Sequence, residues 1–207
     1  MLHKQTVEPR TLSLLEGLMQ LDFLSTFNLV GGTALSLKLG HRISIDLDLF
    51  SKETFDNESV INNLVSKYNE NFILVSASKV GIFCFINDIK VDLIHYNFDI
   101  INQVENIESI RMLSTQDIAA MKIQAILGRG VKKDFFDLHQ LLKVLSLKEV
   151  ISFHKQKYPL QTLHITIPQA ITYFEDAEES EDPVSLNNTS WKQVKQGLQK
   201  VVSDYLK

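Results

Sequence analysis

The chain has 207 residues, of which 44% are hydrophobic, and its formal net charge is −4 at pH 7. This length suffices for one domain with a sizeable core, or for a core domain with an appended lobe. No stretch approaches the eighteen or so apolar residues that a membrane helix needs, and the amino-terminal MLHKQTVEPR lacks the apolar centre of a signal peptide. We therefore expect a cytoplasmic protein that does not associate with a membrane.

The cysteine content and the charge distribution limit the possible disulfides and the charge of the substrate. The single cysteine, Cys84, lies in the apolar run 81–86, so an internal disulfide is excluded and burial is expected. Six of the eight positions from 175 to 182 are acidic, and we expect this stretch to be a solvated loop. Removing these six charges from the net −4 leaves about +2, so the global charge does not exclude an anionic substrate.

The first half of the chain alternates between helical and strand patterns. The turn Asn87-Asp88 separates two apolar runs and predicts a β-hairpin from 80 to 95. Hydrophobic periodicity and turn residues predict the remaining elements. These are a helix after Pro9, a strand at 27–30, a short helix at 33–39, a strand at 43–50, a helix at 56–68 and a strand at 72–75.

The second half is predicted to be helical. Ser114 followed by Asp117 resembles a capping box, and an apolar stripe extends from there to Gly128. Further helices are expected after Gly130, at 148–157 and at 189–207, while 165–174 is ambiguous. The predicted fold class is therefore α/β (α+β), with a mixed sheet flanked by helices in residues 1–110 and a helical lobe in residues 111–207.

Two aspartates stand out in the predicted strand 43–50. Asp46 and Asp48 share one face of the strand, and they lie roughly 6.5 to 7 Å apart. The opposite, apolar face, which we expect to be buried, carries Ile43, Ile45, Leu47 and Leu49. Carboxylates at this separation repel each other unless a cation lies between them, and a hard, oxygen-seeking ion such as Mg²⁺ is the natural one. Taken alone, an Asp-x-Asp pair on a strand is more often an exposed edge than a metal site.

A second pattern precedes these aspartates by twelve residues. Gly31-Gly32-Thr33 falls at the predicted turn from a strand into a helix, where backbone amides and the helix dipole can bind an anion. Such a turn taken alone is usually only a turn. Asp92 is an acid within the apolar hairpin, and it could instead pair with Lys90 or His95. None of the six histidines shows the spacing of a metal ligand.

Together these residues resemble a known family. Gly31-Gly32-Thr33, twelve residues and Asp46-Leu47-Asp48 resemble the nucleotidyltransferase signature of the DNA polymerase beta-like superfamily, with Asp92 as its third carboxylate. More narrowly, the segment 29–50 resembles the AbiEii/AbiGii abortive-infection toxin family. Lys122 and the segment 129–138 resemble the carboxy-terminal motif of that family. The resemblance covers roughly residues 27 to 145.

The resemblance implies a role for each matching residue. Asp46, Asp48 and Asp92 would hold two Mg²⁺ ions, or Mn²⁺, while Gly31, Gly32 and Thr33 would bind the β- and γ-phosphates of an NTP. Lys122 would contact the nucleotide phosphates, and Asp134 with Asp137 would organise the site from the helical lobe. We expect Arg42 and Lys133 either to neutralise phosphate or to pair with these acids. Asp137 could also pair with Lys133, one helical turn away, and Lys122 could be a solvated lysine.

The expected activity is Mg²⁺-dependent transfer of a nucleotide from NTP, with release of pyrophosphate. By resemblance, the acceptor is an RNA end, such as that of tRNA, or a protein hydroxyl, and the setting is a toxin–antitoxin or phage-defence system with a separate antitoxin. Two alternatives remain at this point. One is a non-catalytic protein of the same fold that binds a nucleotide or a partner. The other is a metal-dependent glycosyltransferase with an Asp-x-Asp motif, which Gly31-Gly32-Thr33 and Asp92 disfavour.

Overall fold

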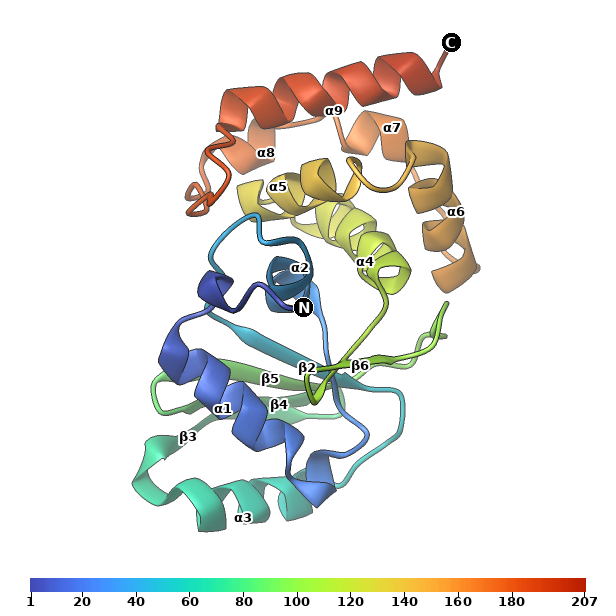
Figure 1. Cartoon of the computed structure of the whole chain (residues 1–207). Coiled ribbons are helices and arrows are strands. Elements are labelled where there is room, and N and C mark those ends of the chain that lie inside the picture. Colours follow the sequence, from blue (N-terminus) through green and yellow to red (C-terminus); the bar gives the residue numbers. More distant parts are fainter.

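A seven-stranded mixed sheet lies at the centre of the computed structural model, which describes residues 1–207 (Figure 1). The order of the strands is β3-β4-β5-β2-β1-β7-β6. The pairs β2/β5 and β1/β7 are parallel, and the other pairs are antiparallel. The strands are β1 (Asn28–Leu29), β2 (Leu47–Ser51), β3 (Phe72–Ser78), β4 (Gly81–Ile86), β5 (Ile89–His95), β6 (Glu105–Ile107) and β7 (Ile110–Met112). The predicted mixed sheet flanked by helices is confirmed.

Helices cover both faces of the sheet. Helices α1 and α3 lie on one face, while α2 and the helices that follow the last strand lie on the other, with α9 farthest from the sheet (Figure 1). None of the helices combines the length and the hydrophobicity that a membrane crossing requires. The α-helices are α1 (Pro9–Met19), α2 (Gly31–Leu39), α3 (Asn57–Tyr68), α4 (Thr115–Gly128), α5 (Lys132–Leu141), α6 (Leu147–Lys157), α7 (Ile167–Ala170), α8 (Glu175–Glu178) and α9 (Trp191–Tyr205).

The strand that carries the aspartates is shorter than predicted. It begins at Leu47, so the prediction of a strand from 43 is wrong for its first four residues. In that segment the amide of Ile43 donates to the carbonyl of Val184 (2.9 Å), and the amide of Ser44 donates to the carbonyl of Thr6 (2.9 Å). These partners lie outside the sheet, so residues 41–46 form a loop. Ile45, expected on the buried face, is 61% exposed because the strand alternation does not extend to it.

The structure confirms one hairpin and adds another. Asn87 and Asp88 both adopt positive φ angles (52° and 63°), as a type I′ turn between two strands requires. Glu108 and Ser109 do the same between β6 and β7 (52° and 67°). The sequence analysis missed this second hairpin because Glu-Ser is not a typical hairpin turn. Strand β7 is buried in the sheet through Ile110 and Met112, and it spans the expected boundary at residue 110.

The helical half follows its predicted starts closely. The Ser114 hydroxyl accepts a hydrogen bond from the amide of Asp117 (3.0 Å) and caps α4. The Ser190 hydroxyl and the Gln193 side chain form a reciprocal capping box at the start of α9. The ambiguous stretch 165–174 contains the short helix α7, which is capped in the same way by Thr166 and Gln169. The helical lobe and the sheet share one hydrophobic core, so the cleft between them has rigid walls.

Candidate active site

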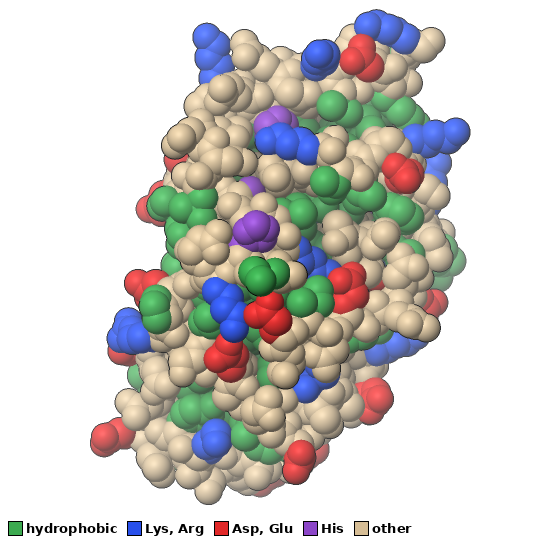
Figure 2. Space-filling view, in the orientation of Figure 1, with side chains coloured by type: hydrophobic (Ala, Val, Ile, Leu, Met, Phe, Trp, Pro, Cys, Tyr) green, Lys and Arg blue, Asp and Glu red, His purple; other side chains and the backbone are tan.

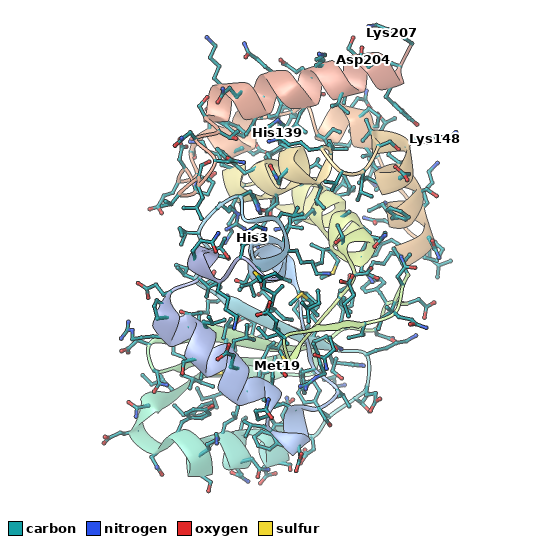
Figure 3. All side chains as sticks on the ribbon, in the orientation of Figure 1. His3, Met19, His139, Lys148, Asp204 and Lys207 are labelled. Atoms are coloured by element: carbon teal, nitrogen blue, oxygen red, sulfur yellow. The ribbon has the colours of Figure 1, made fainter.

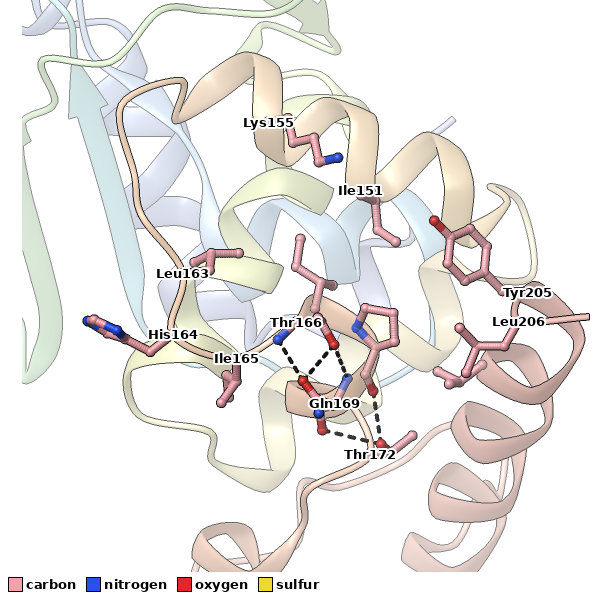
Figure 4. Close-up of a pocket in the computed structure, with 13 residues that line it drawn as sticks. Ile151, Lys155, Leu163, His164, Ile165, Thr166, Gln169, Thr172, Tyr205 and Leu206 are labelled. Carbon is pink, nitrogen blue, oxygen red and sulfur yellow. Dashed lines mark hydrogen bonds between the residues drawn. The ribbon is translucent and has the colours of Figure 1, made fainter.

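Two adjoining cavities lie between the sheet and the helical lobe. Their volumes are about 310 Å³ and 380 Å³, and Gly31, Asp48, Lys122 and Arg129 line both of them. Figure 3 shows side chains from the sheet and from the helices that face it meeting in this layer. A larger cavity of about 760 Å³ lies between α6, α7 and α9, but no acidic residue lines it (Figure 4). The candidate chemistry is therefore in the cleft that Asp48 lines.

Asp48 lines both cavities, and Asp92 is its neighbour on the sheet. They lie opposite each other in the parallel register of β2 and β5, so their side chains project from the same face of the sheet. Burial and the adjacent Asp92 carboxylate raise the pKa of Asp48, against the opposing effect of Lys122 and Lys90. One Asp92 oxygen accepts a hydrogen bond from Lys90 (2.7 Å), whereas the other is buried without a partner. The pair is therefore short of positive charge and of hydrogen-bond donors.

Asp46 lies at the end of the loop that precedes β2. Its side chain is 34% exposed, and the nearest ammonium group, that of Lys133, is 3.9 Å away. No group of three or more His, Cys, Asp or Glu side chains is close enough together to hold a metal ion in this conformation. The donor chemistry nevertheless fits a hard cation, because Asp48 and the unpartnered Asp92 oxygen are oxygen ligands in want of a positive charge.

Gly31 and Gly32 lie at the cleft, and each is packed closely against a charged side chain. Gly31 begins α2 with a φ angle of +68°, and a Cβ there would lie 2.5 Å from Oδ2 of Asp48. A Cβ on Gly32 would lie 2.2 Å from Nη2 of Arg42. No side chain caps this end of α2, so its first amides remain available at the cleft. This is a local arrangement that suits an anion beside the carboxylates.

Thr33 has a different position from its two glycine neighbours. Its side chain is buried and does not line the cavity. The Thr33 hydroxyl donates to the backbone carbonyl of Asp46 and lies 2.8 Å from the Ser44 hydroxyl. The resemblance implied that this hydroxyl binds phosphate, but in the structure it fixes the loop that carries Asp46. Ser44, which sequence reasoning did not select, lines the cavity and belongs to the same contact.

Lys122 and Asp134 join α4 to α5 at the wall of the cleft. The Lys122 ammonium donates to Asp134 (3.0 Å) and lies 2.7 Å from Asp137, and its side chain is only 6% exposed. It is therefore not a solvated lysine. Arg129 forms a bidentate pair with Asp134 (2.9 and 3.1 Å) but is 57% exposed, so its guanidinium also reaches the cleft. Burial acts to raise the pKa of Asp134, but Lys122 and Arg129 outweigh it, and the pKa is lowered.

Asp137 connects the helical lobe to the loop that follows α2. Its carboxylate accepts two hydrogen bonds from Arg42 (2.7 and 2.9 Å), and it lies 2.7 Å from Nε2 of His41. Although burial opposes the shift, Lys122 and Arg42 hold the pKa of Asp137 well below its usual range. Asp137 therefore pairs with the loop rather than with Lys133. Because the Arg42 guanidinium is committed to this carboxylate, the structure supports the pairing alternative for Arg42, and Lys133 is the freer cation.

A segment near the end of the chain closes one side of the cleft. Residues 180–186, here named the strap, form a β-bridge to the loop 41–46 through Arg42 and Ser185. The amide of Leu186 donates to the carbonyl of His41 (2.9 Å), which adds to the bond between Ile43 and Val184. Glu181 and Asp182 of the strap line the smaller cavity.

The strap modifies the expectation of a solvated acidic loop. Glu181 and Asp182 are exposed, but Asp182 pairs with Lys132 (2.7 Å), and the amide of Lys132 donates to the Ser180 hydroxyl (2.9 Å). Sequence reasoning missed these contacts because no local pattern links residues 180–186 to the loop 41–46. Basic and acidic side chains are intermixed on the face shown in Figure 2, without a broad patch of one sign. We therefore consider the charges that line the cleft, and not a broad charged surface, in assigning the site.

Comparisons with known proteins agree with this geometry. The family model described as "Nucleotidyl transferase AbiEii toxin, Type IV TA system" matches residues 13–82 and 83–201. An uncharacterised protein of Aquifex aeolicus (strain VF5) is 34% identical over 200 residues, which cover 93% of this chain and 94% of that protein.

Two solved structures from Helicobacter pylori have the same fold. One is a nucleotidyltransferase candidate with a TM-score of 0.58 and 18% identity, covering 99% of this chain and 96% of the other. The second is the protein JHP933, with a TM-score of 0.56 and 18% identity over 95% and 92% of the two chains. The family match spans nearly the whole chain, including the glycine turn and the three carboxylates Asp46, Asp48 and Asp92. The chain therefore belongs to the AbiEii nucleotidyl transferase toxin family, and the protein is a transferase.

Proposed function

We propose that this protein transfers a nucleoside monophosphate from an NTP to a hydroxyl group, with release of pyrophosphate, and that the reaction depends on Mg²⁺ or Mn²⁺. One observation carries the proposal: the buried, electron-rich pair Asp48 and Asp92 lies beside the uncapped amino terminus of α2. A triphosphate with a divalent cation supplies both the anion and the positive charge that these two features lack.

The residues divide the work of binding. Asp46, Asp48 and Asp92 would hold two divalent ions, which on binding would neutralise charge on the attacking and leaving sides of the α-phosphate. The amides of Gly31 and Gly32 would bind the β- and γ-phosphates. Lys133 and the exposed part of Arg129 offer positive charge at the same cavity.

The transfer step follows from this arrangement. The acceptor oxygen forms a bond to the α-phosphorus, and the bond from that phosphorus to the oxygen bridging the β-phosphate breaks. The proton of the acceptor hydroxyl would pass to Asp92, whose Oδ1 has no hydrogen-bond partner within the protein. Lys122, Asp134, Asp137 and Arg42 act as positioning residues, because their contacts hold α4, α5 and the loop 41–46 around the cleft.

The acceptor and the biological setting are part of the same proposal. A hydroxyl at an RNA end, such as that of tRNA, or on a protein would serve as acceptor. The family description, which names a type IV toxin–antitoxin system, supports the role of a toxin with a separate antitoxin. We further propose a setting in phage defence and a cytoplasmic location. We also propose that residues 1–110 carry the metal and phosphate chemistry, while residues 111–207 close the cleft and position substrates.

Labelling of cell extract tests the proposal directly. The protein is incubated with Mg²⁺, each α-³²P-labelled NTP in turn, and total RNA and protein of a host cell. Label should enter one class of polymer, and the double variant D46A/D48A should abolish it. The matched control is D176A/D204A, which removes two exposed acids outside the cleft. Full labelling by D46A/D48A would refute the proposal, and transfer from UDP-sugars instead of NTPs would redirect it to glycosyl transfer.

A further inference from the structure

The larger of the two cleft cavities is lined by aromatic side chains that the proposed phosphate chemistry does not use. It has a volume of about 380 Å³, and its lining includes Phe50, Tyr96 and Tyr158 together with Asp48. A third cavity, of about 640 Å³, adjoins it, because Gln124 and Tyr158 line both. The two cavities therefore meet beside the aromatic side chains.

These aromatic rings form a chain of contacts. The ring centroids of Phe50 and Tyr96 are 5.1 Å apart, those of Tyr96 and Phe98 are 5.0 Å apart, and those of Phe98 and Tyr158 are 4.9 Å apart. The hydroxyl groups of Tyr96 and Tyr158 are hydrogen-bonded to each other. Phe98 is 43% exposed, which is unusual for a phenylalanine within such a cluster.

A buried cation contacts the cluster. The ammonium group of Lys157 lies 5.2 Å from the centroid of the Tyr96 ring. It is held there by Asp117 (2.7 Å) and by the backbone carbonyl of Asp99 (2.8 Å), and the Lys157 side chain is fully buried. The aromatic surface is therefore fixed in place and does not depend on a ligand for its position.

One polar group faces this surface with a defined orientation. Oε1 of Gln124 lies 3.1 Å from Nε2 of His154. Burial lowers the pKa of His154 to about 4, so the imidazole is neutral at pH 7, and the contact is a hydrogen bond from Nε2–H to the amide oxygen. The amide nitrogen of Gln124 is then the end of the side chain that is free to donate into the cavities.

We propose that these two adjoining cavities form a nucleobase site. Tyr96, which lines the smaller cavity, and Phe98, which lines the larger one, provide stacking surfaces, and the Gln124 amide, which lines both, donates to an acceptor atom of the base. The inference rests on the proposed function, because the base belongs either to the incoming nucleotide or to the last nucleotide of an RNA acceptor. Aromatic stacking suits every base, since each has a π-face, and Gln124 adds selectivity for the atoms at its edge.

Binding measurements test the site without using the transfer reaction. Y96L keeps an apolar side chain and removes the aromatic ring, and F98A removes a partly exposed ring with little risk to the core. Y205L is the matched control, because Tyr205 lines the remote cavity of Figure 4. Each variant is titrated calorimetrically with the four NTPs, with tripolyphosphate and with a short single-stranded RNA, all in the presence of Mg²⁺.

The expected results separate the two sources of the base. If the site holds the base of the incoming nucleotide, Y96L and F98A weaken NTP binding roughly tenfold and leave tripolyphosphate binding unchanged. If it holds the base of the acceptor, the same variants weaken RNA binding roughly tenfold and leave NTP binding unchanged. In either case Q124L changes the order of preference among the bases. Unchanged affinity of Y96L and F98A for every NTP and for RNA would overturn the proposal.

A separate outcome distinguishes this inference from the proposed function. Absence of label in every polymer, combined with weaker nucleotide binding in Y96L and F98A, would refute nucleotidyl transfer and keep the nucleobase site. Efficient labelling that Y96L and F98A leave unaffected, with unchanged binding, would keep the transfer and refute the nucleobase site. A protein hydroxyl as acceptor is recognised by label in protein and by RNA affinity that none of the variants changes, and the NTP titrations then decide the site.

Discussion

Two groups of aspartates face each other across the cleft, and they differ in how their charge is balanced. In the helical lobe, Asp134 and Asp137 are fully buried, and each accepts hydrogen bonds from at least two cationic side chains. On the sheet, Asp48 and Asp92 lie side by side, with one lysine contact and one oxygen that has no partner. Accordingly, the pKa of Asp137 is lowered, whereas burial and the Asp92 carboxylate raise the pKa of Asp48.

This difference shows which acids hold the protein together and which await a ligand. When a buried carboxylate has all its partners, loss of one member of the group leaves an uncompensated buried charge and destabilises the fold. A buried carboxylate that lacks partners costs stability in the absence of a ligand, and such an arrangement is typical of functional sites. The two groups should therefore respond in opposite ways to substitution, to pH and to divalent ions.

The largest effect is expected on activity when the sheet group is changed. Asp48→Asn keeps the shape of the side chain but removes the charge that would bind a divalent ion. We expect nucleotide transfer to fall about a thousandfold or more, because metal binding contributes several kcal/mol to the transition state. Label incorporation measures this, with D204N at the far end of α9 as the control (Figure 3). The ion-free stability of Asp48→Asn should be unchanged or higher, and a marked loss of stability would assign Asp48 a structural role.

The largest effect on stability is expected when the helical group is changed. Asp137→Ala leaves Arg42 and Lys122 without their common partner in the core. Breaking a buried ion pair in this way costs about 3–5 kcal/mol of unfolding free energy, which urea titration followed by circular dichroism measures. Asp204→Ala, which removes only an exposed pair with Lys207, should leave the stability nearly unchanged. Equal stability of the two variants would show that the cluster around Asp137 does not stabilise the fold.

The pH dependence should have opposite signs for the two groups. Because the folded pKa of Asp48 is raised, its proton favours the folded state, so this contribution to stability grows as pH falls through the raised pKa. Asp134 and Asp137 have lowered pKa values, so their contribution is present above about pH 4 and is lost only as pH falls through those lower values.

Protons and divalent ions should compete for the sheet group. Mg²⁺ at a hundred times its dissociation constant should stabilise the protein by about 2.7 kcal/mol at pH 7.5, and this gain should shrink as the solution is acidified towards pH 5. Urea titrations across this range, with and without Mg²⁺, measure both trends, and Asp48→Asn is the control in which both are weakened. If Mg²⁺ stabilises the Asp48→Asn variant as much as the unchanged protein, the ion does not bind at Asp48.

The smallest effect is expected at the strap. Asp182 lines the cavity next to the glycine turn and would repel a triphosphate, although its pairing with Lys132 and its exposure screen the charge. Asp182→Asn should lower KM for NTP about two- to threefold, since one charge at such a distance in water contributes under about 1 kcal/mol. Steady-state kinetics measure this, with D176N as the control. A rise in KM would mean that Asp182 contributes to binding.

The sequence predicted those features whose signals are local. The hairpin at Asn87-Asp88 and the glycine turn depend on backbone conformations that a few adjacent residues encode, and the structure has both. The strand alternation placed Leu47, Leu49 and Asp48 correctly but extended too far. The backbone of residues 43–46 bonds to residues remote in sequence, and periodicity cannot register this.

The sequence could not identify partners at long range. Arg42 lies 95 residues before Asp137. The strap lies roughly 140 residues after the loop 41–46, to which it is bonded. Only the packing of α5 against the loop 41–46 brings these groups together. The contacts of Arg42 with Asp137 and of Thr33 with the carbonyl of Asp46 are of this kind. The family resemblance indicated that these residues mattered without indicating what they touch.

The position of the strap in the sequence determines when, during translation, the loop 41–46 can form all its backbone hydrogen bonds. The backbone of the loop that carries Asp46 is hydrogen-bonded to residues 184–186, which the ribosome adds long after the loop itself. At about 5–20 residues per second, the interval of roughly 140 residues takes about 7–28 seconds. A nascent chain therefore lacks these backbone partners of the loop until residues 184–186 have been added.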